Sequence, residues 1–428
     1  MTVTGIIAEC NPFHEGHAYL IRKAREITGA DFVIAALSGD YVQRGLPAVM
    51  PWEYRVRELL ANGADLVIAL PLYVSTGAAD YFARGGVALL EGTGVVTDIV
   101  FGSESGDLAA LHNTADALLT STGPQAQFDE SLRSTFRGGG TFAGALADTA
   151  GGALPHTPND LLGAHYLKAL SMSGSGIRPH AVPRIACPSA SERRKALVAQ
   201  RARGQNTAAF PVLSHDDLSG ALLHALITNR EYRAYLDVSE DLSNRIRALL
   251  PSYRSYGDFA AQVKTRNVTH TRVNRALLHI LLGMRQDTMQ LFDESYGLCG
   301  WIRPLGMRRS AAELLREIKK AASVPYLDKL SRAQSRLDPA LFAIFDEEIR
   351  AELLYDIVLR ASGSVSGCTV HGTGPDPCED RDASGTDRHP HGERDASDTD
   401  RHPHGERDAL PQSSPAVTAY AKQIILAD

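Results

Sequence analysis

The sequence has few cysteines and no long apolar run, and both absences exclude whole classes of protein. Its five cysteines are scattered without a CxxC pair, which argues against a disulfide framework or a structural zinc site and fits a reducing cytoplasm. No apolar stretch reaches the roughly 18 residues of a transmembrane helix. The N-terminal MTVTGIIAEC lacks the charged and apolar regions of a signal peptide and favours a first β-strand. We therefore expect a cytoplasmic protein with no membrane partner.

Outside one segment, the chain also lacks an excess of charge of either sign. The formal net charge is −6 at pH 7, and residues 376–408 account for all of it with eleven acidic and five basic residues. Local basic patches, rather than the total charge, must decide whether a polyanion binds. The 428 residues are 44% hydrophobic and 22% charged, which suits a folded protein of about two to three domains and excludes global disorder.

The first 105 residues alternate between strand and helix patterns. Apolar and β-branched runs of the length of a buried parallel strand occur at residues 2–9, 31–38, 64–71 and 97–104. Apolar residues at helical spacing occur between them, at 17–27, 51–63 and 79–92. These units predict an α/β fold, a Rossmann-like parallel sheet covered by helices on both faces. Ligands of such sheets bind at the carboxyl ends of the strands.

The rest of the chain is mostly helical in pattern. Helical patterns over residues 106–180 lead to a strand-like stretch at 178–186 and a helix at 191–202. From about residue 214, one helical pattern follows another. We therefore expect an α/β domain over residues 1–205, a mostly helical domain over 206–363 and a C-terminal helix over 415–428.

Residues 364–414 interrupt this pattern. TDRHPHGERDA occurs twice in this segment, at 386–396 and 399–409, and the segment is polar and poor in aliphatic residues. Such composition predicts a disordered low-complexity insertion. The repeated histidines leave two interpretations open, weak metal binding or a tract without function: His389, His391, His402 and His404.

The strongest chemical signal is N-P-F-H-E-G-H, which follows the first expected strand and opens the first helix. His14 and His17 are three apart and share one face of a helix start, and Gly16 lets a ligand approach the backbone. A helix N-terminus has unpaired N–H groups and partial positive charge, which suit phosphate. Imidazoles there can donate hydrogen bonds to phosphoryl oxygens as charge develops. The alternative is a pair of histidines that only cap a helix.

A second element, S-A-S-E-R-R, opens the helix at 191–202. Ser189 and Ser191 would supply hydroxyl and N–H groups, and Arg194 would supply charge. The alternative is an ordinary serine N-cap beside an exposed arginine. Both elements resemble the HIGH-type nucleotidyltransferase superfamily, whose members activate the α-phosphate of ATP. The resemblance implies that His14 and His17 act at the α-phosphate and that the second element holds the β- and γ-phosphates.

The resemblance becomes more specific when further motifs are read in order. GIIAECNPFHEGH is followed by ALSGDYVQRGLPA (36–48), FGSE (101–104), PNDLLGAHYL (158–167) and KTRNVTHTRVNR (264–275). Over residues 1 to about 360, this order resembles the bacterial tRNA(Met) cytidine acetate ligase family. The resemblance implies a ligase that uses ATP, Mg²⁺ and acetate to form an acetyl-adenylate and then N4-acetylcytidine at wobble position C34 of elongator tRNA(Met). AMP and pyrophosphate are the expected products.

The resemblance also implies the residues of the ATP site. His14 and His17 are the implied catalytic residues, and no protein residue is implied as a metal ligand. Without the resemblance, Gly102 could be a turn, Asn159 a helix N-cap and Arg184 a surface charge. The implied ATP contacts are Ile7, Ala8, Glu9, Cys10, Asn11, Pro12, Phe13, His14, Glu15, Gly16, His17, Ala18, Tyr19, Leu20, Gly102, Asn159, Arg184, Ser189, Ser191 and Arg194.

Two further segments are candidates for substrate contact. SGDYVQRG follows the second strand and includes Asp40, Gln43 and Arg44, although it could be a solvated loop. Residues 263–286 contain five basic residues and no acidic one, which suits contact with RNA phosphates, although a basic helix face is often only solvated. The basic residues that we expect to contact tRNA are Lys264, Arg266, Arg272 and Arg275.

Two rival functions remain open at this point. A small-molecule adenylyltransferase would share the ATP site and would bind no tRNA. A catalytically inactive RNA-binding scaffold is disfavoured by the intact His14, Gly16 and His17. We expect elongator tRNA(Met) and acetate as partners and no DNA. No residue is an obvious general base for attack by the cytidine amine.

Overall fold

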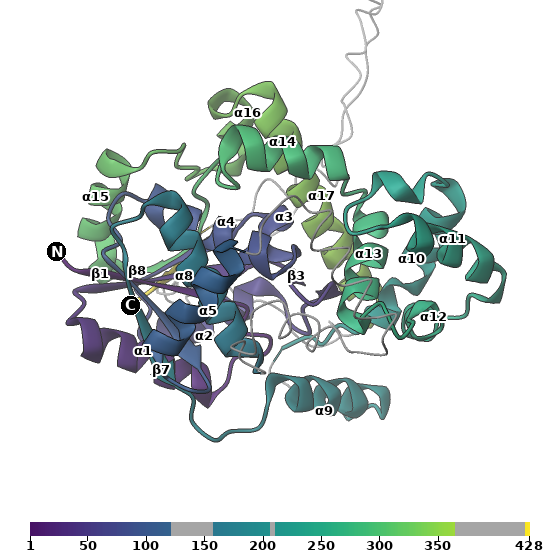
Figure 1. The fold of residues 1–428 in the computed structure, drawn as a ribbon, viewed down its shortest axis with the longest axis horizontal. Helices are drawn as coiled ribbons and strands as arrows, with labels where there is room; N and C mark the ends of the chain where they lie inside the picture. The colour runs from purple at the N-terminus through teal and green to yellow at the C-terminus, as the bar shows by residue number, and fades with distance from the viewer. Residues whose placement is uncertain (121–156, 206–209, 364–423) are drawn as a thin grey trace, which may run out of the picture.

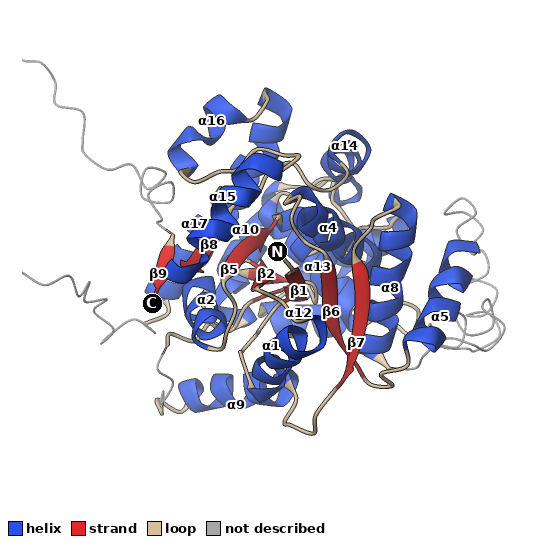
Figure 2. Cartoon of the chain, turned by 90° about the vertical axis from the view of Figure 1, so that its left-hand side faces the viewer, coloured by secondary structure: helices blue, strands red, loops and turns tan. Residues whose placement is uncertain are grey.

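The computed structural model describes residues 1–120, 157–205, 210–363 and 424–428 (Figure 1). The insertion expected at 364–414, and all but the end of the helix expected at 415–428, lie outside these residues. Within the described part, a seven-stranded sheet is flanked by helices, and a second group of helices lies to one side of it (Figures 1 and 2).

The strands and helices have the following bounds. The strands are β1 (Val3–Ala8), β2 (Phe32–Ser38), β3 (Tyr41–Val42), β4 (Leu46–Pro47), β5 (Leu66–Leu70), β6 (Asp98–Ser103), β7 (Arg178–Pro183), β8 (Pro304–Arg308) and β9 (Ile425–Ala427). The α-helices are α1 (Glu15–Thr28), α2 (Trp52–Ala61), α3 (Leu72–Ser75), α4 (Ala79–Gly92), α5 (Leu108–Thr120), α8 (Pro158–Ser173), α9 (Ala190–Ala202), α10 (Ser219–Thr228), α11 (Glu240–Leu249), α12 (Tyr256–Val263), α13 (His270–Leu282), α14 (Gln286–Tyr296), α15 (Ala312–Ala321), α16 (Ala333–Arg336) and α17 (Pro339–Ala361).

The sheet order is β7-β6-β1-β2-β5-β8-β9, and the five strands from β7 to β5 run parallel. The chain starts at β1, moves outward through β2 to β5, and then returns to the other side of β1 to form β6 and β7. The strand order therefore reverses between β1 and β6, which is where open α/β sheets bind their ligands. The Rossmann-like α/β fold expected from the alternating patterns is confirmed.

Alternating residues of the strands enter two apolar clusters on opposite faces of the sheet. In β2, Ile34 and Ala36 belong to one cluster, and Val33 and Leu37 belong to the other, which α1 and α2 complete. This period of two is what a strand buried on both faces requires. The first cluster continues without a break into the C-terminal helices, as far as Phe345 of α17. The helices expected over 206–363 thus share a core with the sheet, and the division into domains stays a prediction.

The C-terminal end of the described chain differs from expectation. Residues 425–427 form β9 instead of part of a helix, so that expectation is wrong there. Similarly, β8 lies within the stretch expected to be mostly helical, and it joins the sheet antiparallel to β5. β9 then pairs in parallel with β8, from Gly306 to Arg308. Pro304 and Gly306 do not favour a helix, and at residues 425–427 the pairing with β8 outweighs the local pattern. Among the described residues, no helix combines the length and apolar character needed to cross a bilayer.

Candidate active site

A cavity of about 500 Å³ opens at the carboxyl ends of β1, β6 and β7, where the strand order reverses. Phe101 of β6 and Tyr166 of α8 line it with rings whose centroids are 5.5 Å apart. Such walls suit a flat heteroaromatic base. The cavity is also lined by many of the expected ATP contacts: Ile7, Ala8, Glu9, His14, Gly16, His17, Tyr19, Leu20, Gly102, Asn159, Arg184, Ser189, Ser191 and Arg194.

The turn between β1 and α1 fixes the tautomers of both histidines. The Gly16 N–H donates to Nδ1 of His14 at 3.1 Å, and the His14 N–H donates to Nδ1 of His17 at 3.1 Å. Because each Nδ1 accepts a hydrogen bond, each neutral ring must carry its proton on Nε2. Each Nε2–H can therefore donate to a ligand. Gly16 is required here, since an added Cβ would lie 2.8 Å from Cε1 of His14.

Both imidazoles are held neutral. Burial, together with the neighbouring His14 ring 3.9 Å away between centroids, lowers the pKa of His17 to about 3. Burial also lowers the pKa of His14, and Arg193 adds to this effect while Glu15 opposes it. Neutral rings with Nε2–H donors can stabilise charge that develops on phosphoryl oxygens. The site can therefore act on a phosphate without moving a proton from either histidine.

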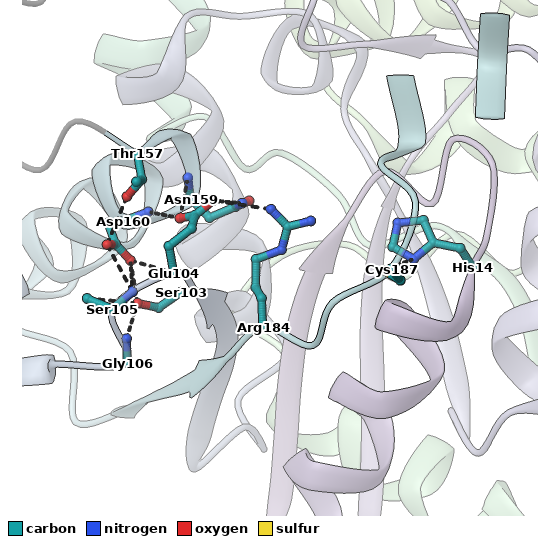
Figure 3. Close-up of polar contacts among 10 residues, drawn as sticks. All are labelled: His14, Ser103, Glu104, Ser105, Gly106, Thr157, Asn159, Asp160, Arg184 and Cys187. Carbon is teal, nitrogen blue, oxygen red and sulfur yellow. Dashed lines mark hydrogen bonds and ion pairs between the residues drawn. The ribbon is translucent and has the colours of Figure 1, made fainter. Parts of the chain in front are cut away.

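At the β6–β7 side of the cavity, Glu104 joins three elements (Figure 3). Its carboxylate accepts hydrogen bonds from the Asn159 side chain at 2.6 Å and from Arg184 Nη1 at 3.1 Å. It also accepts the backbone N–H groups of Asn159 and Asp160, at 3.1 and 3.0 Å, and so caps the N-terminus of α8. Because Asn159 uses its amino group here, its Oδ1 is the atom left to accept from a ligand.

The S-A-S-E-R-R segment lines the cavity where α9 begins. Ser189 caps α9, with its hydroxyl and its N–H both donating to Glu192. Arg194 donates to the backbone carbonyl of Asn11 at 2.6 Å and to the Ser191 hydroxyl at 2.9 Å. Both of these hydrogen-bond partners of Arg194 are neutral, and Glu9 is an acidic group that interacts with its charge from the same cavity.

Some expected contacts do not line the cavity. Cys10, Asn11 and Pro12 are buried in the turn, where Asn11 Oδ1 accepts the N–H of Val49 at 2.8 Å. Burial also raises the pKa of the Cys10 thiol to about 12, so this thiol is not a nucleophile. The remaining residues that do not line it are Phe13, Glu15 and Ala18.

Three comparisons with known proteins agree with this geometry. A sequence model of the HIGH Nucleotidyl Transferase family matches residues 1–366. A tRNA(Met) cytidine acetate ligase of Thermoanaerobacter sp. (strain X514) is 31% identical in an alignment 402 positions long that covers 86% of this chain and 98% of that protein. A protein of the same name from Acetivibrio thermocellus is 32% identical in an alignment 399 positions long that covers 83% of this chain and 94% of that one.

The chain belongs to the tRNA(Met) cytidine acetate ligase family of HIGH nucleotidyltransferases. The resemblance seen in its motifs is thereby confirmed. A solved structure from the same family, Thermotoga maritima TmcAL bound with alpha-thio ATP, matches with a TM-score of 0.73 and 27% identity over 84% of this chain and 95% of that one.

In this member of the tRNA(Met) cytidine acetate ligase family, the sequence did not predict two features of the cavity. Glu104 stands in the FGSE motif, yet its role depends on residues 55 and 80 positions further along the chain. Cys187 lines the cavity with its sulfur 4.0 Å from Nδ1 of His14 (Figure 3). No local pattern marks either residue.

The expected RNA contacts fall into two groups. Lys264, Arg266 and Arg272 are exposed at the end of α12 and the start of α13. Arg275 is half-buried, and its guanidinium pairs with Asp237 at 2.8 Å. The first three side chains therefore lie at the surface, whereas Arg275 is held in an ion pair with Asp237.

Replacing Glu104 by glutamine should weaken ATP binding about tenfold. A neutral amide makes a weaker hydrogen bond to Arg184 than a carboxylate does, and the amino group of glutamine replaces one of the two accepting oxygens of Glu104 by a donor. The dissociation constant for ATP, measured by calorimetry, checks this. Glu91→Gln, on α4 and outside the cavity lining, is the matched control. Unchanged ATP affinity in Glu104→Gln would contradict a role for Glu104 in holding Asn159 and Arg184.

Proposed function

We propose that this protein is an ATP-dependent ligase that activates acetate as acetyl-adenylate and acetylates N4 of wobble cytidine C34 in elongator tRNA(Met). The observation that carries the proposal is the pair of neutral imidazoles, each presenting an Nε2–H to the cavity at the reversal of strand order. The relatives named tRNA(Met) cytidine acetate ligase support the choice of acid and acceptor.

In the first step, an acetate oxygen attacks the α-phosphorus of ATP and pyrophosphate leaves. His14 and His17 donate hydrogen bonds to the phosphoryl oxygens as negative charge grows on them. Arg184 and Arg194 both line the cavity and offset the charge of the nucleotide. Among the described residues there is no cluster of three or more His, Cys, Asp or Glu that could hold a metal ion, so we expect Mg²⁺ to enter with the triphosphate and offset its charge.

In the second step, the cytidine amine attacks the carbonyl carbon of the acetyl-adenylate and AMP leaves. The mixed anhydride must be shielded from water, and the cavity walls can exclude it. Lys264, Arg266 and Arg272 form an exposed basic face that suits RNA phosphates. The β3–β4 hairpin includes Gln43 and Arg44 of the cavity lining, and its Gly45 lies against the backbone of Asn274 and Arg275 in α13.

The test uses purified protein with ATP, Mg²⁺, ¹⁴C-acetate and bulk bacterial tRNA. Label recovered from tRNA as N4-acetylcytidine is the expected result. Acetate-dependent pyrophosphate release without label in tRNA would overturn the RNA substrate and favour a small-molecule adenylyltransferase. Absence of both signals in folded protein would overturn the enzyme assignment.

Reversing charge on the basic face should weaken tRNA binding. Lys264→Glu and Arg272→Glu should each raise the dissociation constant for tRNA about tenfold at low salt, because each removes a phosphate contact and adds repulsion. Each should also reduce the salt dependence of binding by about one unit of slope. Filter binding across a salt series measures both quantities.

Arg22→Glu is the matched control for these variants, since Arg22 is exposed on α1, on the far side of the sheet from α13 (Figure 1). It should bind tRNA as the wild type does. Equal losses in Arg22→Glu and Arg272→Glu would show a nonspecific effect of net charge and would contradict a local RNA face.

A further inference from the structure

Glu9 is an acidic group at an otherwise cationic end of the cavity. It follows β1 directly, and its carboxyl lines the cavity together with Arg44 and Arg194. Its Oε1 accepts the backbone N–H of Gln43 at 2.8 Å, and its carbonyl oxygen accepts Nη1 of the buried Arg55 at 2.9 Å. The carboxyl is therefore fixed in place, and only one of its two oxygens is engaged by Gln43.

The hairpin that contacts Glu9 is itself held on two sides. The Tyr41 hydroxyl donates to the carbonyl of Ala351 in α17 at 3.1 Å. The Tyr256 hydroxyl of α12 lies 3.3 Å from the carbonyl oxygen of Gly45. Gly45 has φ +73°, and an added Cβ would lie 2.2 Å from the backbone nitrogen of Arg275 in α13. Only glycine permits this contact, which seats the hairpin against the helix that begins at the basic face.

Glu9 follows β1, between the two sides of the cavity, and its hydrogen bond from Gln43 joins it to the hairpin. One side of the cavity, on one side of β1, is formed by Gly102 within β6, by Glu104 directly after β6 and by Arg184 directly after β7. The hairpin follows β2, on the other side of β1. The aromatic wall that suits a base lies on the first side, so an RNA held by the basic face would enter from the second. A carboxylate repels phosphate, which distinguishes Glu9 from the arginines Arg44 and Arg194 that line the cavity with it.

Building on the proposed function, we propose that Glu9 is the general base of the acetyl transfer step. As the cytidine N4 attacks the carbonyl carbon, a C–N bond forms and the C–O bond to the adenylate breaks, and AMP leaves with the electron pair. The amine proton passes to the carboxylate of Glu9, which becomes a neutral carboxylic acid and later returns the proton to water. A positioned base of this kind contributes about 10²- to 10⁴-fold to a rate.

The electrostatic surroundings of Glu9 support this assignment. Burial raises the pKa of Glu9, which makes its carboxylate a stronger base than an exposed one. The hydrogen bond from Gln43 opposes this rise, as do the positive charges of Arg44, Arg194 and Arg55. These groups favour the charged, proton-accepting form of the carboxylate, whereas burial favours the neutral acid.

Glu9→Gln is the decisive variant, because glutamine keeps the size of the side chain and keeps an oxygen to accept the Gln43 N–H. We expect single-turnover acetyl transfer to tRNA to slow by about 100-fold, and acetate-dependent ATP–pyrophosphate exchange at saturating ATP to fall at least tenfold less than transfer does. tRNA affinity should be unchanged. Release of acetylhydroxamate with hydroxylamine as acceptor should follow the exchange rate rather than the transfer rate, because hydroxylamine is a strong nucleophile that needs no base.

Other outcomes overturn the assignment. Equal loss of exchange and transfer would assign Glu9 to the adenylation step, through ATP or Mg²⁺, and unchanged transfer would remove it from the reaction. Glu104→Gln is the matched control, a neutralised carboxyl in the same cavity, and it should weaken ATP binding instead. If the wild type itself shows exchange without transfer, the proposed function fails, and that failure is distinct from failure of the Glu9 proposal.

Discussion

Replacing His17 by alanine should lower the rate of acetate-dependent ATP–pyrophosphate exchange by up to about 10³-fold, which is the cost of losing one donor aimed at developing charge. The Nδ1 of His17 accepts the N–H of His14, so its proton is on Nε2 and points away from that contact. Alanine removes both the donor and the group that orders the turn. The exchange rate at saturating ATP measures the loss, because a transition-state contact affects kcat more than ground-state affinity.

His17→Gln separates the donor from the rest of the ring. A glutamine amide can place an N–H near the position of Nε2, so it should recover part of the exchange rate. His112→Ala, an exposed histidine on α5, should leave the rate unchanged. A loss in His17→Ala confined to KM for ATP would contradict transition-state stabilisation and would assign His17 to binding alone.

The same geometry sets the expected pH dependence. The folded-state pKa of His17, about 3, is lower than the ordinary value of 6.5, so the ring stays neutral as pH falls through 6.5. Its Nε2–H donor therefore persists, and protonation of His17 should not reduce exchange between pH 8 and pH 5. A fall in the rate with a midpoint near pH 6.5 that disappears in His17→Gln would contradict this.

Much of the sheet could be predicted because its strands are contiguous apolar runs. β1, β2, β5 and β6 lie within one or two residues of their expected bounds. β3 and β4 are two residues each, too short for a period to be seen, and β8 and β9 depend on partners that come from distant parts of the chain. Strand formation of the latter kind is decided by tertiary pairing rather than by local preference.

The candidate site divides in the same way. The NPFHEGH turn is local, so its place after a strand and its helix-capping hydrogen bonds could be expected from sequence. Glu104, Asn159 and Arg184 come from three elements, and only folding brings them together. Arg275 has the spacing of an RNA contact, but its partner Asp237 precedes it by 38 residues, and no local pattern reveals that pairing.

Replacing Arg303 by alanine should lower the free energy of unfolding by about 3–5 kcal/mol, because it leaves buried carboxylates without their cation. Arg303 is 2% exposed. Its guanidinium donates two hydrogen bonds to Glu352, at 2.5 and 3.0 Å, and one to Glu348 at 2.9 Å. Both carboxyls are on α17, one turn apart and equally buried. Urea denaturation measures the loss.

The sign of the pH dependence tests the cause of this loss. Burial already raises the pKa of Glu348 to about 7, above its ordinary value of 4.5, so the folded state binds the proton more tightly than the unfolded state. The contribution of this group to stability is therefore complete below about pH 4.5 and declines as pH rises through 7. Without Arg303, both carboxyls should favour the proton more strongly. The deficit of Arg303→Ala should then be smaller at pH 5 than at pH 8, and the opposite order would contradict the ion-pair explanation.

Arg350→Ala is the matched control, since Arg350 is an exposed arginine on α17 that pairs with Asp346, and it should cost no more than about 0.5 kcal/mol. The consequences of Arg303→Ala should also reach the active site. α17 accepts the Tyr41 hydroxyl at Ala351, and its Tyr355 hydroxyl donates to the carbonyl of Ala48 at 2.9 Å, so the same helix fixes both ends of the hairpin region beside Glu9. At a temperature where the variant is folded, acetyl transfer should therefore fall more than ATP–pyrophosphate exchange, because the hydrogen bonds that orient His14 and His17 lie within residues 14–17.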